Sequence, residues 1–222
     1  MDLKENLAFF QEKIKDTNAK LIIVSKTKPV EILQDAYNLG YKVFGENRVQ
    51  ELVPKYEDLP KDVEWHLIGT LQANKVKYIA PFVRMIHSVD SFKLLQEVNK
   101  QALKNNKVID CLLQIHIADE ATKFGLDYFE AAEILRSNQL ASLQNIRIVG
   151  LMGMASYTDD MEKVRAEFRG LKNFFEEMKT EIQQTNVILT EISMGMSSDY
   201  GIALEEGSTM IRIGSAIFGA RS

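Results

Sequence analysis

The feature that most constrains this chain is a regular alternation of short apolar runs with longer amphipathic stretches. The runs are continuously apolar, which indicates strands buried on both faces, as in a parallel sheet covered by helices. The stretches between them repeat their apolar residues about every 3.6 positions, the period of an α-helix. The eight runs are residues 21–24, 42–44, 65–68, 85–87, 108–115, 146–151, 187–192 and 210–213. The sequence therefore predicts an α/β fold.

Eight strand–helix units in 222 residues predict a compact (β/α)8 TIM-type barrel that forms one domain over residues 1–222. The alternative is an open, doubly wound sheet, which periodicity alone does not separate from a barrel. The eighth run is followed only by residues 216–222, which leaves little room for an eighth helix. We expect an extra N-terminal helix at about residues 3–14 to cover that gap.

Composition excludes some classes of function. The chain has 27 Lys and Arg against 31 Asp and Glu, a net charge of −4, and this mild acidity argues against nucleic acid as the main partner. No apolar run approaches the roughly 20 residues of a membrane helix, so no membrane partner is expected. The charged first 20 residues resemble neither a signal nor a transit peptide, which predicts a cytoplasmic protein. The single cysteine, Cys111, lies in an apolar run and is expected to be a buried hydrophobic residue.

Function in parallel α/β proteins gathers at the carboxyl ends of the strands. Lys26 follows the first run directly, whereas Lys28 precedes Pro29, which is expected to start the next helix. Partial desolvation at a barrel mouth lowers the pKa of a lysine, and a neutral amine can form a Schiff base with an aldehyde. Taken alone, this segment favours a solvated loop lysine.

The runs at 187–192 and 210–213 are followed by small and hydroxyl-bearing residues. Ser197, Ser198, Gly214 and Ser215 fall in the loops where barrels often bind phosphate, and Ser197 or Ser198 is expected at a helix N-terminus. Helix caps and turn glycines would explain the same residues. Arg212 lies within the eighth run, where an arginine needs an anionic or polar partner.

Other polar residues near the strand ends allow more than one interpretation. Asn47 follows the second run and either caps the next helix or binds a ligand. His66, His87 and His116 all lie in expected strands, so a zinc site was considered, but no Cys or HExxH-type pattern supports it. The chain has neither a P-loop nor a GxGxxG motif after a strand, which disfavours nucleotide-binding functions.

An amine after the first strand and a phosphate-binding loop pair after the last two strands would face one barrel mouth. Together they describe a site for a phosphorylated aldehyde. A sugar-phosphate aldolase or isomerase would fit this description as well as a cofactor site does.

Six motifs spread along the chain resemble those of the pyridoxal phosphate homeostasis protein family. They are VSKTKP at 24–29, FGENRVQE at 44–51, WHLIGTLQANK at 65–75, GLMGM at 150–154, SMGMSSDY at 193–200 and GSTMIRIGSAIFGAR at 207–221. The resemblance implies a barrel like the N-terminal domain of alanine racemase, with pyridoxal 5′-phosphate (PLP) as cofactor.

The resemblance also implies roles for individual residues. Lys26 matches the lysine that holds PLP as a covalent aldimine, and Arg212 matches a position near the pyridine nitrogen. Ser215 stands where many relatives have threonine, which keeps the hydroxyl. The phosphate is expected near Ser197, Gly214 and Ser215. The pocket lining is expected to include Asn47, His66 and Met196. Lys123 matches a family lysine near the site.

Two functions remain open under this resemblance. One is a non-catalytic carrier that holds PLP, takes part in vitamin B6 homeostasis and passes PLP to apoenzymes. The other is an amino-acid racemase, which needs acid–base groups on both faces of its substrate. In alanine racemase the second group is a tyrosine of an additional β domain, whereas this chain ends at Ser222 and places Tyr157 and Tyr200 in expected loops. We therefore expect a monomeric carrier.

Overall fold

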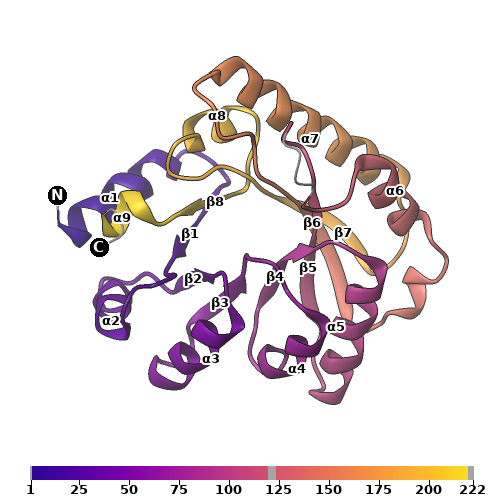
Figure 1. The fold of residues 1–222 in the computed structure, drawn as a ribbon, viewed down its shortest axis with the longest axis horizontal. Coiled ribbons are helices and arrows are strands. Elements are labelled where there is room, and N and C mark those ends of the chain that lie inside the picture. Colours follow the sequence, from indigo (N-terminus) through magenta and orange to yellow (C-terminus); the bar gives the residue numbers. More distant parts are fainter. Residues whose placement is uncertain (1, 120–123, 220–222) are drawn as a thin grey trace.

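The computed structural model describes residues 2–119 and 124–219. In these residues eight parallel strands follow one another around a closed barrel, and β8 pairs with β1 to close it (Figure 1). This confirms the barrel and excludes the open sheet. The strands are β1 Lys20–Val24, β2 Val43–Glu46, β3 Glu64–Leu67, β4 Met85–Val89, β5 Ile109–Ile115, β6 Ile146–Gly153, β7 Val187–Ser193 and β8 Met210–Ile213.

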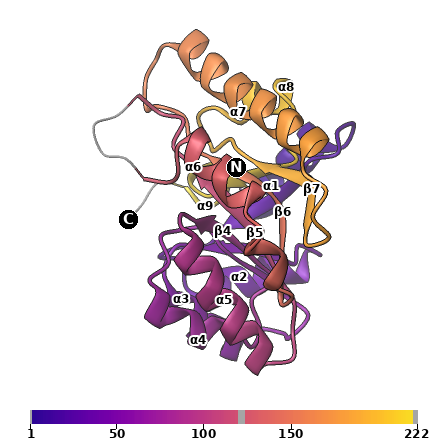
Figure 2. The same cartoon turned by 90° about the vertical axis from the view of Figure 1, so that its right-hand side faces the viewer.

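Helices surround the barrel on its outside (Figure 2). They are α1 Leu3–Ile14, α2 Val30–Asn38, α3 Val49–Asp58, α4 Val76–Ile79, α5 Phe92–Lys104, α6 Tyr128–Arg136, α7 Met161–Glu181, α8 Tyr200–Glu205 and α9 Ser215–Phe218, with 3-10 turns at Ala73–Lys75 and Leu140–Ser142. None of the helices within the described ranges is long and apolar enough to cross a membrane.

The N-terminal helix fills the place that a full eighth helix would occupy. A capping box between Asp2 and Glu5 starts α1, and its apolar side is buried through Leu7, Phe10 and Ile14. Helices α1 and α9 lie side by side (Figure 1). The Asn6 side chain donates a hydrogen bond of 2.8 Å to the carbonyl of Ile217. The expected helix at residues 3–14 is confirmed.

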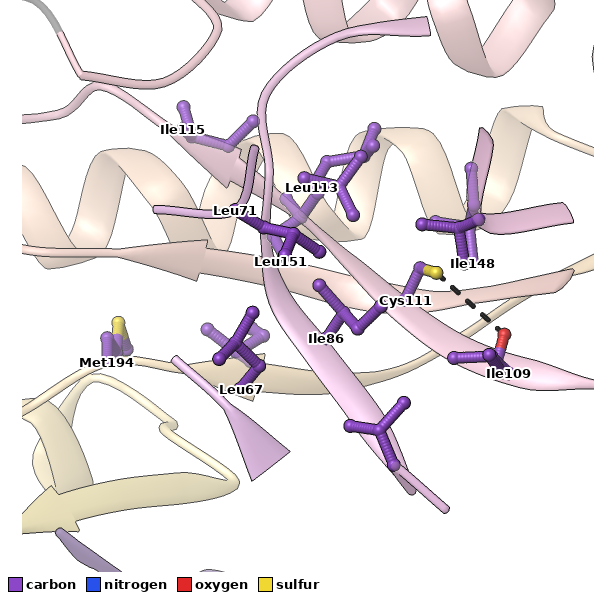
Figure 3. Close-up of a cluster of buried hydrophobic side chains, with 14 of the residues drawn as sticks. Leu67, Leu71, Ile86, Ile109, Cys111, Leu113, Ile115, Ile148, Leu151 and Met194 are labelled. Atoms are coloured by element: carbon purple, nitrogen blue, oxygen red, sulfur yellow. Dashed lines mark hydrogen bonds between the residues drawn. The ribbon is translucent and has the colours of Figure 1, made fainter. Parts of the chain in front are cut away.

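Two apolar clusters reflect the alternation of side chains along the strands. The main core lies between the barrel and its helices and includes Cys111, whose Sγ lies 3.8 Å from the Ile109 carbonyl oxygen (Figure 3). Burial raises the pKa of the Cys111 thiol, so this residue acts as a hydrophobic core residue as expected. Side chains alternate along each strand, so the residues between these core positions point the other way and fill the barrel interior. These residues are Ile22, Met85, Leu112, Val149, Met152 and Met210.

Several strand and helix ends differ from the sequence expectations. Gly45 and Glu46 were expected in a loop but belong to β2, because they pair with His66 and Leu67 of β3. Ser193 likewise ends β7 instead of starting a loop. The side chains of Glu46 and Ser193 have buried hydrogen-bond partners, which the apolar pattern alone does not reveal.

Candidate functional site

A cavity of about 560 Å³ lies at the carboxyl ends of the strands. It is built by residues that lie in or follow β1, β2, β3, β6, β7 and β8. Its lining includes most of the site residues that the sequence predicts: Lys26, Asn47, Met196, Ser197, Arg212, Gly214 and Ser215. Ile68, Met154 and Met196 add apolar surface to its walls, and Val24, Thr27, Lys28, Tyr157, Ser198 and Gly219 complete it. The structure thus brings residues from both halves of the chain into one pocket.

Lys26 lies at the end of β1 and is partly exposed in the cavity. Its neighbour Ser25 is completely buried, and the Ser25 amide donates to the carbonyl of Gly45 at 3.0 Å. Thr27, on the other side, has a φ of 62°, in the left-handed region that β-branched residues rarely adopt. The lysine is therefore carried by a sharply defined backbone turn and not by a loose loop.

Small polar groups meet in the cavity where the chain follows β7 and β8. The Oγ atoms of Ser197 and Ser215 lie 3.2 Å apart, and the amide of Ala216 donates to Ser197 Oγ at 3.4 Å. A Cβ on Gly214 would lie 3.1 Å from the carbonyl oxygen of Val24, so glycine permits a close approach of the two chains here. Hydroxyls and backbone N–H groups around a glycine are suitable donors for a phosphate.

The expected helix caps near this site are different residues. Asn47 does not cap α3, whose N-cap is Arg48. The loop after β3 instead packs closely against the backbone of Asn47, because a Cβ on Gly69 would lie 2.4 Å from the Asn47 carbonyl oxygen. Helix α8 begins at Tyr200 after Asp199, so Ser197 and Ser198 precede that helix without capping it. Ser198 directly precedes the N-cap residue Asp199, and Ser197 Oγ accepts from the Ala216 amide in the first turn of α9.

Arg212 is 4% exposed and presents a buried positive charge to the cavity. Its Nη1 donates to Ser193 Oγ at 2.6 Å, and its Nη2 donates to the carbonyl of Gly153 at 3.1 Å. Burial lowers the pKa of Arg212 to about 10, while the charge of Asp199 opposes this shift. The guanidinium is therefore protonated at neutral pH, and the polar partners that the sequence required are present.

A chain of hydrogen bonds continues from Arg212 into the barrel. Ser193 Oγ lies 2.9 Å from His87 Nδ1, and His87 Nε2 lies 2.8 Å from His66 Nδ1. Burial lowers the pKa of His66 to about 3, with Arg84 and Lys20 adding to the shift, and it also lowers the pKa of His87. Both rings are therefore neutral, which lets each of them donate through one nitrogen and accept through the other.

His66 accordingly lies behind Arg212 and is not among the residues that line the cavity. His66 and His87 face each other at hydrogen-bond distance, and His116 takes no part in this pair. Within residues 2–119 and 124–219 no group of His, Cys, Asp or Glu side chains is arranged to hold a metal ion. The histidine pair thus forms a buried support for Arg212.

Sequence reasoning missed several residues around the site. Ser193 was not distinguished within its motif, and Glu46 and Lys55, which are buried beside Ser25, gave no signal of pairing. Tyr157 lines the cavity, whereas Tyr200 packs edge-on against Phe10 with ring centroids 5.2 Å apart. Lys123 lies outside the described residues.

Comparison with known proteins identifies the family. The family profile of the alanine racemase N-terminal domain matches residues 1–222. The chain is 45% identical over 204 residues to the pyridoxal phosphate homeostasis protein of Aquifex aeolicus. The matched region covers 91% of this chain and 87% of that protein. The chain belongs to the pyridoxal phosphate homeostasis protein family.

Solved structures agree with this membership. PipY of Synechococcus elongatus PCC7942, solved with PLP bound, is 35% identical and superposes with a TM-score of 0.87 over 98% of this chain and 100% of that one. The alanine racemase of Clostridium difficile 630 is 14% identical, with a TM-score of 0.78 over 99% of this chain and 57% of that one. That second likeness shows the shared barrel fold, as the family resemblance implied.

Proposed function

We propose that this protein binds PLP reversibly in the cavity at the barrel mouth and acts in PLP homeostasis as a non-catalytic carrier. The observation that carries the proposal is the arrangement of one amine, one phosphate-suited group of donors and one buried guanidinium around a single cavity. The same family includes PipY, whose solved structure contains PLP. When bound, PLP supplies an aldehyde that reacts reversibly with amines and a ring that withdraws electrons.

The residues present fit the parts of PLP. Ser197, Ser215 and the amide at the start of α9 would hold the phosphate, and Met154 and Met196 offer apolar surface to the ring. The amine of Lys26 would attack the aldehyde carbon, so that a C=N bond replaces the C=O bond and one water leaves.

Arg212 argues against wide transaminase-type chemistry, although racemases tolerate an arginine at this position. A permanent positive charge beside the pyridine nitrogen disfavours protonation of that nitrogen, and an unprotonated ring is a weaker electron sink. The hydrogen bonds that Arg212 donates to the Ser193 hydroxyl and to the Gly153 carbonyl hold this charge in place. Such a site retains PLP while giving little support to carbanion chemistry.

A racemase is the second function, and the position of Tyr157 favours it. Tyr157 lines the same cavity as Lys26, so an acid–base group could reach a substrate there. This residue is 96% exposed, however, whereas racemisation requires an enclosed setting. We therefore prefer the carrier.

The attachment experiment tests the lysine assignment. Purified protein is mixed with PLP, reduced with borohydride and mapped by peptide mass spectrometry. We expect the cofactor on Lys26, no trapped cofactor in Lys26→Ala, and trapping as in the wild type in Lys28→Ala, since Lys28 lines the same cavity. Cofactor trapped on Lys28 in the wild type would overturn the assignment.

A second experiment separates carrier from racemase. The PLP-loaded protein is incubated with a PLP-dependent apoenzyme and, separately, with single enantiomers of amino acids. A carrier restores the activity of the apoenzyme and leaves the enantiomers unchanged. Racemisation that disappears in Tyr157→Phe would favour the enzyme. Light scattering on the same sample tests the monomeric state that we propose.

A further inference from the structure

Helix α3 contacts the backbone on both sides of Lys26. The Lys55 Nζ donates a hydrogen bond of 2.8 Å to the carbonyl of Ser25, the residue before Lys26. Glu51 Oε2 accepts a hydrogen bond of 2.7 Å from the amide of Thr27, the residue after it. Glu51 and Lys55 are one helical turn apart, with 3.8 Å between Oε2 and Nζ. Two side chains of one helix thus fix the peptide groups that flank the lysine.

The contact on the Ser25 side is buried. Glu46 and Ser25 are completely buried and Lys55 is 7% exposed. Glu46 Oε1 accepts from Ser25 Oγ at 2.6 Å and pairs with Lys55 Nζ at 2.5 Å. Burial raises the pKa of Glu46, and the hydrogen bonds from Lys55 and Ser25 act against that shift. Buried charges are costly unless they are paired, so this pair fixes the turn firmly in one geometry.

The contact on the Thr27 side holds an unfavourable backbone conformation. Thr27 has a φ of 62°, which costs a β-branched residue free energy and persists only where neighbouring groups hold it. The group that bonds the Thr27 amide is the carboxylate of Glu51. This strained turn directly follows the lysine that lines the cavity.

We propose that Glu46, Glu51 and Lys55 are positioning residues that fix the peptide groups on both sides of Lys26, so that its amine meets the aldehyde of PLP in the cavity. This inference rests on the proposed role of Lys26. It assigns a purpose to a buried ion pair whose side chains contact the turn around Lys26. These three residues orient the reacting amine without touching the cofactor.

Glu51 allows a test that leaves the fold intact, because its side chain is 28% exposed while Glu46 and Lys55 are buried. Glu51→Ala removes the acceptor for the Thr27 amide, and Glu51→Gln keeps an acceptor oxygen without the charge. Glu57→Ala is the matched control, since Glu57 is an exposed glutamate on the same helix.

The measurement is the rate at which PLP becomes attached to Lys26, read by borohydride trapping at timed intervals. We expect attachment to be roughly tenfold slower in Glu51→Ala, the size of effect that loss of one hydrogen bond to a charged group produces. Glu51→Gln should recover most of the rate, and Glu57→Ala should match the wild type.

Pyridoxine 5′-phosphate separates positioning from structural damage, because it carries an alcohol in place of the aldehyde. Its affinity should be the same in wild type and Glu51→Ala. A parallel loss of analogue affinity and attachment rate in Glu51→Ala would mean a distorted cavity and would overturn the positioning role. An unchanged attachment rate would overturn it as well.

A measurement on the protein without cofactor keeps the two proposals distinguishable. If the wild type bound neither PLP nor its analogue, the proposed function would fail. The turn can still be tested by labelling lysines with acetic anhydride and comparing Lys26 with Lys28 by mass mapping. We expect the ratio of Lys26 to Lys28 labelling to rise in Glu51→Ala, since a released turn exposes the amine; an unchanged ratio would contradict the inference.

Discussion

At the scale of single residues, polar side chains of the site either face the cavity or lie behind it. Lys26, Ser197 and Arg212 line it, whereas Ser193 and His87 are buried and bind only other protein groups. Residues that face the cavity should affect cofactor affinity when they are changed. Residues behind it should affect the stability of the fold as well.

Ser197→Ala tests the phosphate end of the cavity. Removing the hydroxyl that lies 3.2 Å from Ser215 Oγ should weaken PLP binding by about 1–3 kcal/mol, the usual effect of losing a hydrogen bond to a charged group. Equilibrium dialysis with PLP measures the change. Ser142→Ala is the control, because Ser142 is an exposed serine that does not line the cavity. Equal losses in both variants would mean that Ser197 has no special role.

Ser193→Ala tests the support of Arg212. The substitution leaves a buried guanidinium nitrogen and a buried histidine nitrogen without their shared partner, which should lower the free energy of unfolding by about 2–4 kcal/mol. It should also weaken PLP binding, because Arg212 is then free to move. Urea denaturation and PLP titration measure the two effects.

Ser208→Ala is the control for that experiment. Ser208 is also buried, and its hydroxyl lies 2.8 Å from the Met194 carbonyl oxygen without contacting Arg212. We expect it to lose stability but to keep its affinity for PLP. If Ser193→Ala bound PLP as tightly as Ser208→Ala, the hydrogen bonds behind Arg212 would have no effect on PLP affinity.

The sequence predicts some of these residues better than others for a physical reason. Lys26 and Arg212 are conspicuous because a charge adjoins or interrupts an apolar run. Glu46 and Ser193 are not, because a polar residue after an apolar run normally marks a loop. Glu46 pairs with Lys55 of α3 and Ser193 with Arg212 of β8, and such tertiary contacts leave no local pattern in the sequence.

At the scale of elements, the apolar pattern located every strand of the barrel in the described residues to within a few positions. The eighth strand, Met210–Ile213, has the predicted bounds, and the first begins one residue earlier than expected, at Lys20. Helix α1 was also located from its period. Helix starts near the cavity were less predictable, because Arg48 and Asp199 occupy N-cap positions without a side-chain cap bond.

Asn6→Ala tests the packing of α1 against α9. The Asn6 side chain bonds the carbonyl of Ile217, so its loss should lower the free energy of unfolding by about 1 kcal/mol. It should also weaken PLP binding slightly, because α9 starts at Ser215 in the phosphate end of the cavity. Thermal unfolding with and without PLP measures both, and Asn18→Ala, an exposed asparagine, is the control. A variant as stable as the control would show that this bond does not hold α9.

At the scale of the whole molecule, closure of the barrel brings distant parts of the chain together. Lys26 follows β1 and Arg212 lies in β8, and the two strands are paired neighbours. His66 and His87 of β3 and β4 meet Ser193 of β7 across the interior. The order of the strands was predictable from the repeat, but these contacts across the interior depend on which side chains face inward at each level.

The buried histidine pair makes stability depend on pH. The folded-state pKa of His66 is about 3 and that of His87 is also lowered, below an ordinary value of 6.5. As the pH falls below 6.5 the unfolded chain binds protons that the folded chain does not, so the free energy of unfolding decreases. Between pH 7.5 and 5 the expected loss from His66 is about 2 kcal/mol, and the lowered pKa of His87 acts in the same direction. Urea denaturation at several pH values measures it, and His66→Gln should remove the part of the slope that His66 contributes. A flat profile between pH 7.5 and 5 would mean that the folded barrel accepts a proton on this pair.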